Sequence, residues 1–319
     1  MNSHHLAPSR LSLHNAFNRD LKPVLSIHSG EQVIFKTLDS GWGKESRTAI
    51  GERRQRWTDI IPENQAPFFG HALTGPVEIK GAMPGDVIAV NILDIVPGSW
   101  GWASAGGFKS DWNKRLNIED EQEVLYDYSL NHKTMRATSQ FKNFDYSILM
   151  KPFMGIMGLA PKDKGFHSTF PPRNTGGNID CKDLQKGSTL YLPVEVAGGL
   201  FSVGDGHAAQ GNGEISGPAL ECPMEKVHLE FHLLKDMSIE RPRAITQDHY
   251  ITLAFHENVE EAMWLALEDM INWMQKIFSF TKVEATLWAS LAVDLSLTQV
   301  VNGTKGVHAS LKKDQLVRG

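Results

Sequence analysis

The sequence predicts a mainly β protein with a smaller α+β part at its C-terminal end, the β part being a jelly-roll-like or CUB-like β-sandwich. Apolar and polar residues alternate with period two in several segments before residue 240, which is typical of half-buried strands. Helical spacing of apolar residues appears only after Asn258. We therefore predict a β-rich sandwich or barrel body over residues 1–240, which carries Gly-rich active-site loops, and a smaller α+β portion with two helices and a terminal hairpin over residues 241–319.

The strands of the body are predicted from alternation bounded by Gly, Pro and Ser. Such segments occur at residues 24–38, 76–96, 189–203 and 225–234. The first of them, VLSIHSGEQVIFKTL, predicts two antiparallel strands around a Ser-Gly turn. Residues 104–145 are polar and have no sustained period, so we interpret them as an excursion over the β core with a hairpin at 122–138.

The C-terminal helices are predicted from their caps and their spacing. From Asn258, which fits an N-cap, apolar residues recur at three- and four-residue steps as far as Ile277. Thr281 and Glu284 have the capping-box spacing, in which each side chain accepts a hydrogen bond from a free amide. Beyond this second helix, the pair Asn302-Gly303 predicts a tight hairpin turn between two strands.

Length and composition limit the classes of protein to which the chain can belong. Its 319 residues suffice for one large domain or two, and no apolar run reaches the ~20 residues of a membrane-spanning helix. A net charge of −5 without a basic cluster gives no basis for binding nucleic acid. Cys181 and Cys222 fit a reducing compartment, and the first residues lack the apolar core of a signal peptide. We expect a cytoplasmic protein with no membrane partner.

Residues 204–214, GDGHAAQGNGE, are the first candidate site, because they gather four glycines with an Asp, a His and a Glu. We predict a loop, since ordered glycines mark tight turns or close approach of the backbone. Asp205 and His207 offer the oxygen and nitrogen ligands of Zn²⁺ and similar ions. Glu214 is placed to act as a general base beside such an ion. The alternative, in which Asp205 holds a turn and His207 faces water, stays open.

Other acidic residues and histidines provide further candidate ligands. Asp180 ends the Gly-paired segment NTGGNIDC, His71 precedes a predicted strand, and Asp39 closes an early strand. Each is equally explained as a turn, surface or hydrogen-bonded residue. A further set on one strand face, which an exposed polar face explains as well, consists of His228, Glu230 and His232.

Signatures of nucleotide binding and of covalent catalysis are absent from the sequence. The Gly-rich segment is not a G-x-G-x-x-G before a helix, and neither a P-loop nor a G-x-S-x-G elbow occurs. Cys222 has Glu221 and Lys226 nearby, as a nitrilase-type nucleophile requires, but Pro223 and the strand pattern oppose that interpretation.

Several segments follow one another in an order typical of one known family. They are HHLAPSRLSLHNAFNRDLKPVLSIHSGEQVIFKTLDS, TGPVEIKGAMPGDVIAVNI, MKPFMGIMGLAP, NTGGNID, GSTLYLPVEVAGGLFSVGDGHAAQGNGE and SLAVDLSLTQVVNG. Over nearly its whole length the chain resembles the acetamidase/formamidase family, and the GDGHAAQ block is highly specific. The resemblance is lost at residues 99–147, where this chain looks longer, so access of the substrate could differ there.

The resemblance implies a cytoplasmic enzyme that cleaves the C–N bond of small aliphatic amides, such as formamide or acetamide, to the carboxylate and ammonia. It also implies a divalent metal, for which we expect zinc. The positions that match the family's ligand motifs are Asp205, His207 and Asp180, with His71 and Asp39 as further members.

In the mechanism that fits this resemblance, Glu214 takes a proton from water and returns one to the departing nitrogen, with His207 as the second catalytic residue. Gly211 and Gly213 would let backbone amides approach the substrate closely. The alternative is a non-catalytic jelly-roll module with a structural calcium site, which would leave His207 without a role. From the size of the chain alone we expect a homodimer.

Overall fold

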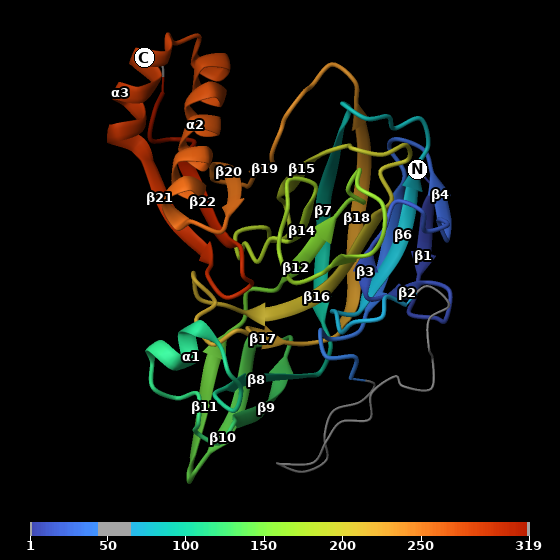
Figure 1. The fold of residues 1–319 in the computed structure, drawn as a ribbon, viewed down its shortest axis with the longest axis vertical. Coiled ribbons are helices and arrows are strands. Elements are labelled where there is room, and N and C mark those ends of the chain that lie inside the picture. The colour runs from blue at the N-terminus through green and yellow to red at the C-terminus, as the bar shows by residue number, and fades with distance from the viewer. Residues whose placement is uncertain (1, 44–64, 318–319) are drawn as a thin grey trace.

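Two large β-sheets form the body of the computed structural model, which describes residues 2–43 and 65–317 (Figure 1). Among these residues, the first sheet has nine strands, in the order β1 (Ser3–Leu6), β5 (Gln32–Thr37), β18 (Met224–Leu234), β7 (Val87–Pro97), β15 (Thr189–Pro193), β19 (Arg243–Ile245), β20 (His249–His256), β22 (Lys305–Lys312) and β21 (Val293–Gln299). This sheet extends from the body into the C-terminal portion.

The second sheet has eleven strands within the described residues. Its main path is β11 (Phe144–Leu149), β10 (Arg136–Phe141), β9 (Val124–Asn131), β8 (Trp100–Ala105), β17 (Leu220–Glu221), β16 (Phe201–Ala209), β12 (Phe153–Gly158) and β14 (Gly176–Asn178). Beside β16 lies β6 (Leu73–Ile79), which also pairs with β2 (Leu13–His14) and β4 (Leu25–Ile27). A small separate sheet joins β3 (Ala16–Phe17) to β13 (His167–Ser168).

The main hydrophobic core lies between these two sheets and confirms the prediction of a mainly β protein. Phe35 on β5 and Phe231 on β18 contact Phe201 on the opposite sheet, with ring centroids 6.1 and 5.0 Å from that of Phe201. All three rings are fully buried. Because each buried side chain of this size contributes ~1.5–3 kcal/mol, contacts of this kind hold β16 rigidly in the second sheet.

The strands predicted at residues 24–38 form, but they do not pair with each other. β4 pairs with β6 in the second sheet, whereas β5 pairs with β1 and β18 in the first. Between them Gly30 has a φ of 88° and turns the chain from one sheet to the other. The predicted antiparallel pair was therefore wrong, because alternation identifies the buried face of a strand and not its neighbour. The segments 76–96 and 189–203 are likewise each divided between the two sheets, the first as β6 and β7 and the second as β15 and β16.

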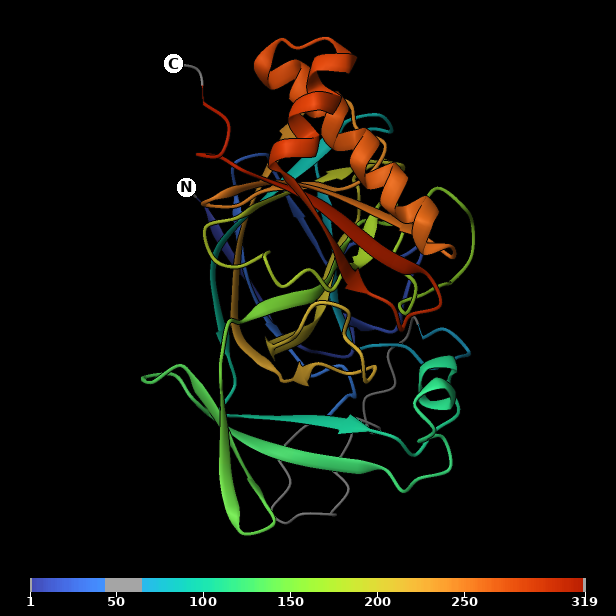
Figure 2. The same ribbon diagram turned by 90° about the vertical axis from the view of Figure 1, so that its left-hand side faces the viewer.

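The polar segment after β8 forms an extension that projects from the body, at the bottom of Figures 1 and 2. It contains the short helix α1 (Asp111–Arg115) and strands β9, β10 and β11. The predicted hairpin at 122–138 is confirmed as β9 and β10, which pair in antiparallel register. We call strands β9 to β11, residues 124–149, the arm.

The C-terminal portion is built as predicted, with two helices beside a hairpin of strands. α2 (Val259–Phe278) has Asn258 as its N-cap, and α3 (Lys282–Ala292) has the capping box of Thr281 and Glu284. The buried face of α2, which packs on β20 and β22, includes Ala262, Ala266, Met270 and Met274. In the described part of the chain, no helix is long and apolar enough to span a membrane.

The nine-stranded sheet runs without a break from the body into this C-terminal portion. β15 of the body pairs with β19, Leu190 lying opposite Ala244. The division of the chain at residue 240 therefore stays a prediction about domains, although the helices and the arm lie at opposite ends of the molecule (Figure 2).

His14 on β2 should make the fold sensitive to acid. Its ring is buried and lies 3.0 Å from Ser202 Oγ, and burial lowers its pKa from 6.5 to about 4. The unfolded chain therefore binds a proton that the folded chain excludes, so this contribution to stability is complete above pH ~6.5 and is lost as the pH falls to ~4.

We expect the variant His14→Gln, which keeps a polar partner for Ser202, to lose about 3 kcal/mol less unfolding free energy than the wild type between pH 7 and pH 4. Urea unfolding at the two pH values measures this difference. Equal losses in both proteins would show that His14 does not carry the acid sensitivity.

Candidate functional site

β16 carries the two central residues of the candidate site, Asp205 and His207. The strand continues to Ala209, so the loop predicted at residues 204–214 was wrong over its first half. The glycines serve close packing there: a Cβ on Gly204 would lie 2.3 Å from the carbonyl oxygen of Ala72. The strand is buried along its whole length, so the alternative in which His207 faces water was also wrong.

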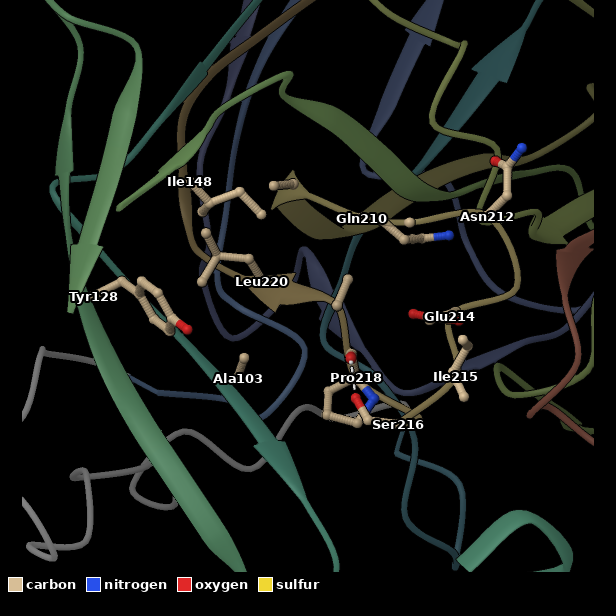
Figure 3. Close-up of a pocket in the computed structure, with 13 residues that line it drawn as sticks. Ala103, Tyr128, Ile148, Gln210, Asn212, Glu214, Ile215, Ser216, Pro218 and Leu220 are labelled. Carbon is tan, nitrogen blue, oxygen red and sulfur yellow. Dashed lines mark hydrogen bonds between the residues drawn. The ribbon is translucent and has the colours of Figure 1, made fainter. Parts of the chain in front are cut away.

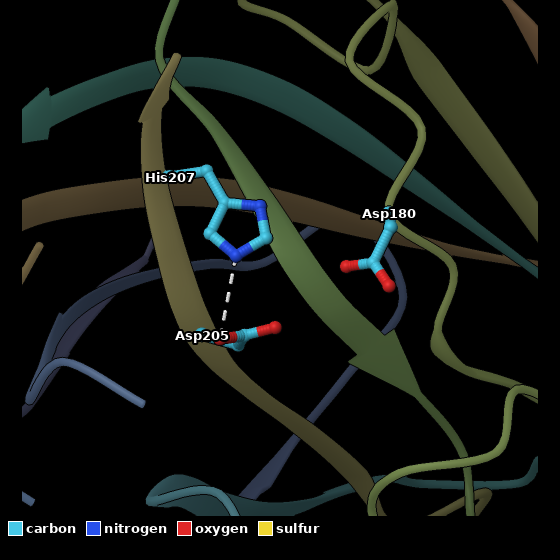
Figure 4. A group of neighbouring side chains, drawn as sticks. All are labelled: Asp180, Asp205 and His207. Atoms are coloured by element: carbon cyan, nitrogen blue, oxygen red, sulfur yellow. Dashed lines mark ion pairs between the residues drawn. The ribbon is translucent and has the colours of Figure 1, made fainter. Parts of the chain in front are cut away.

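Three carboxylates from other segments join these two side chains. Atoms of Asp180, Asp205 and His207 that could bind an ion lie within 4.8 Å of one another, and so do those of His207, Glu214 and Glu221. Figure 4 shows the carboxylates of Asp180 and Asp205 converging on the space beside the His207 ring. We call these five buried residues the acid–histidine cluster.

His207 lies at the centre of the cluster. Its Nε2 atom is 3.1 Å from Glu221 Oε1 and 3.4 Å from Asp205 Oδ1. Among the described residues, no hydrogen-bond partner is found for that nitrogen or for three buried carboxylate oxygens, which are Asp180 Oδ1, Glu214 Oε2 and Glu221 Oε2. Buried polar atoms are paired in most proteins, so unpaired atoms at one point indicate a missing ligand.

Three of the acidic residues adopt a backbone conformation that L-amino acids rarely use. The φ angles are 52° at Asp180, 56° at Asp205 and 49° at Glu214. Such residues cost ~1–3 kcal/mol each and persist where the surrounding fold imposes them, typically at functional sites. Here this conformation directs all three carboxylates towards the same space.

Amide side chains outside the cluster orient two of its members. Gln210 Oε1 lies 3.0 Å from Nδ1 of His207, while the Gln210 amide donates to the carbonyl oxygen of Asp180. A carbonyl oxygen must accept, so Nδ1 of His207 carries a proton, and in the neutral ring Nε2 is then the nitrogen that could bind an ion. From the C-terminal hairpin, Asn302 donates to Asp180 Oδ2 at 2.8 Å.

Burial and mutual repulsion shift the pKa values of the carboxyl groups. Burial, with Asp205 nearby, raises the pKa of Asp180 to about 8. Burial and Asp180 raise the pKa of Glu214 well above its usual range. Although burial opposes its positive charge, Glu221 and Asp205 raise the pKa of His207. Burial and repulsion thus disfavour the charged forms of these carboxyl groups, and a bound cation would stabilise them.

Gly155 on β12 leaves room for an ion within the cluster. A Cβ at this position would lie 2.5 Å from Asp205 Oδ2, 2.8 Å from Asp180 Oδ1 and 2.8 Å from His207 Cε1. No other amino acid fits there without moving these atoms. Carboxylate oxygens without hydrogen bonds, an imidazole nitrogen that faces two carboxylates, and this space together fit a divalent metal ion.

Two residues predicted as ligands lie outside both ion-binding groups. Asp39 is buried, but its oxygens accept hydrogen bonds from the Gly43 amide at 2.6 Å and from Trp102 Nε1 at 2.8 Å. His71 is half-buried near the cluster, where its Nδ1 lies 2.8 Å from Thr169 Oγ1. Both oxygens of Asp39 therefore have partners, whereas among the described residues only one ring nitrogen of His71 does, and its role as a ligand stays a prediction.

A cavity of about 350 Å³ opens beside the cluster, and Glu214 lines it (Figure 3). Gly211 lines it too. Gly213 does not line the cavity. Its amide donates a hydrogen bond to the carbonyl oxygen of Thr298 at 3.0 Å. That contact ties the loop to the end of β21 and so positions Glu214, instead of leaving the Gly213 amide for a substrate.

Glu221 is a member of the site that the sequence indicated only as a neighbour of Cys222. Glu221 lies opposite His207 in the register of β16 and β17, and one of its oxygens accepts a hydrogen bond from the Ala219 amide. Its sequence neighbours form no motif. The polar residues His228, Glu230 and His232 on β18 form no ion-binding group among the described residues. They make hydrogen bonds instead, His232 with Glu230 and His228 with Gln32.

The fold and the site together define a class of protein: a two-sheet β body with a buried acid–histidine cluster, fitted to a metal ion, beside a cavity. The profile of the Acetamidase/Formamidase family matches residues 2–168 and 163–310, so the chain belongs to this family.

Individual relatives agree with this assignment. The formamidase of Methylophilus methylotrophus is 25% identical over 262 residues, and the acetamidase of Mycolicibacterium smegmatis is 26% identical over 266. These matches cover 64% of this chain and span about 60% of the length of those relatives. A crystal structure of an acetamidase from Bacillus halodurans superimposes with a TM-score of 0.82 at 27% identity, over 97% of each chain.

Proposed function

We propose that the protein is a metal-dependent amidase that hydrolyses the C–N bond of a primary amide to the carboxylate and ammonia. The observation that carries this proposal is that Glu214 belongs both to the acid–histidine cluster and to the wall of the cavity. A substrate in the cavity would therefore meet a buried carboxyl group directly beside the ion-binding atoms. Membership of the acetamidase/formamidase family supports the same reaction.

Asp180, Asp205, His207 and Glu221 would hold the metal, which we propose to be zinc. When bound, such an ion polarises the amide carbonyl or the attacking water and stabilises the negative charge that develops on oxygen. A mixed set of one imidazole and several carboxylates suits zinc. A structural calcium site is the weaker candidate, because Nε2 of His207 faces the other ligand atoms and calcium takes oxygen ligands.

Glu214 would move the protons of the reaction. Water adds its oxygen to the carbonyl carbon while Glu214 takes a proton from it, and the C–N bond breaks as Glu214 returns that proton to the nitrogen. An amide RCONH₂ and water thus give RCOO⁻ and NH₄⁺. Burial and Asp180 raise the pKa of Glu214 well above its usual range, which makes it a stronger base than an exposed carboxylate and suits a group that takes up a proton and returns it.

Gln210 and Asn302 would act as positioning residues. The Gln210 side chain holds the His207 tautomer whose Nε2 is unprotonated, and Asn302 holds one oxygen of Asp180. Because Asn302 comes from the C-terminal hairpin, that portion would complete the site in the body. The homodimer, the cytoplasmic location and the choice of amide also stay predictions.

An ammonia-release assay with metal removal tests the proposed function. We expect the purified protein to release ammonia from amides, to lose this activity after dialysis against a chelator, and to regain it with one equivalent of Zn²⁺. Calcium should not restore it. Full activity in protein shown to be metal-free by elemental analysis would contradict the role of the metal, and restoration by calcium alone would contradict the proposed zinc.

A further inference from the structure

The cavity beside Glu214 has two chemically different ends. Gln210, Asn212 and Glu214 line one end, and Tyr128, Ile148 and Leu220 line the other (Figure 3). The polar end joins the acid–histidine cluster through Glu214. The apolar end is formed where the arm approaches the start of β17, since Tyr128 lies on β9 and Ile148 on β11.

Formamide and acetamide would leave most of this cavity empty. Its volume of about 350 Å³ falls within the ~300–1,000 Å³ that is typical of sites for much larger ligands. Among the described residues that line it, Glu214 is the one acidic or basic residue. An acidic or basic tail would therefore find no opposite charge at the far end, whereas an apolar tail would replace water against apolar side chains.

We propose that the apolar end of this cavity is an acyl-chain site, and that the preferred substrates are primary amides with an apolar acyl group of several carbons. This inference rests on the proposed amidase function. The reacting carbonyl lies at the Glu214 end, and the acyl chain extends towards Tyr128 and Ile148 on the arm. The arm is then a determinant of specificity, made by the segment 124–149 that projects from the body.

The first test compares amides on the metal-loaded wild-type enzyme. The values of kcat/KM are measured by ammonia release for formamide, acetamide, butanamide, hexanamide and succinamic acid, which carries a carboxylate at the end of its chain. We expect kcat/KM for hexanamide to exceed that for acetamide by at least ~10-fold, because one methylene in a fitting apolar pocket is worth ~10-fold or more. Succinamic acid should be hydrolysed worse than butanamide.

The possible failures of this test are distinguishable. If acetamide is hydrolysed as well as hexanamide, the acyl-chain site is wrong and the proposed amidase function stands. If no amide releases ammonia, both are wrong. If succinamic acid is preferred, the apolar character of the site is wrong.

The second test assigns the apolar end to the arm. The ratio of kcat/KM for hexanamide to that for acetamide should fall by ~10-fold in Ile148→Asp and in Tyr128→Ala, and should be kept in Tyr128→Phe, which retains the ring. Phe144→Ser is the matched control, since Phe144 is exposed on β11 and outside the cavity lining. An unchanged ratio in the first two variants, or the same fall in the control, would overturn the role of the arm.

Discussion

Replacing Glu214 by Gln is expected to lower kcat for amide hydrolysis by ~10²–10⁴-fold, because the amide side chain cannot accept a proton from water or return it to the leaving nitrogen. The substitution conserves the shape of a side chain that is 6% exposed and has an unpaired oxygen in the cluster. The loss should appear in kcat with little change in KM, since the proton moves in the transition state. Steady-state ammonia release measures both constants.

The metal content of the Glu214→Gln variant distinguishes a role of Glu214 in proton transfer from a role in metal binding. We expect Glu214→Gln to retain one equivalent of zinc by elemental analysis, and Glu225→Gln, which alters an exposed ion pair with Lys36, to resemble the wild type in both respects. If Glu214→Gln loses its zinc, Glu214 is a ligand and another group moves the proton. If its kcat stays within tenfold of the wild type, the proposed proton transfer is wrong.

Replacing Asp205 by Asn is expected to weaken zinc binding by more than ~100-fold and to abolish activity at low zinc concentration. Loss of residues that merely orient metal ligands costs ~10–100-fold in affinity, and loss of a charged ligand should cost more. Asn tolerates the positive φ of 56° at this position, so the backbone need not change. Competition with a fluorescent chelator measures the affinity.

The control for this variant is Asp183→Asn. Asp183 follows Asp180 in the same segment, but its carboxylate lies near His308 and outside the ion-binding groups. We expect wild-type zinc affinity in the control. If the zinc affinity of Asp205→Asn is unchanged, Asp205 is not a metal ligand, whatever activity the protein has.

Parts of the site that depend on neighbours in sequence could be predicted from the sequence. Asp205 and His207 are two residues apart, and a run of glycines beside them indicates close approach of the backbone. The same reasoning identified Asp180 through NTGGNID and Glu214 at the end of the Gly-rich segment. The structure brings these four side chains together.

Parts of the site that depend on the pairing of distant strands could not be predicted from the sequence. Glu221 joins the cluster because β17 lies beside β16, and Gly155 matters because β12 lies on the other side of that strand. Asp39 looked like an equal candidate in the sequence, but Trp102 and the Gly43 amide occupy its oxygens. Alternation and motif spacing contain no information about such partners, which long-range packing selects.

By itself the sequence determined the mainly β class, the two capped helices, the C-terminal hairpin and the residue types of a metal site, because each depends on residues a few positions apart. The tertiary structure alone decided which sheet each strand joins, which carboxylates share one buried space, and that the arm lines a cavity beside Glu214. Those features come from contacts between segments far apart in the chain, where the burial of side chains and the pairing of backbone groups are settled together.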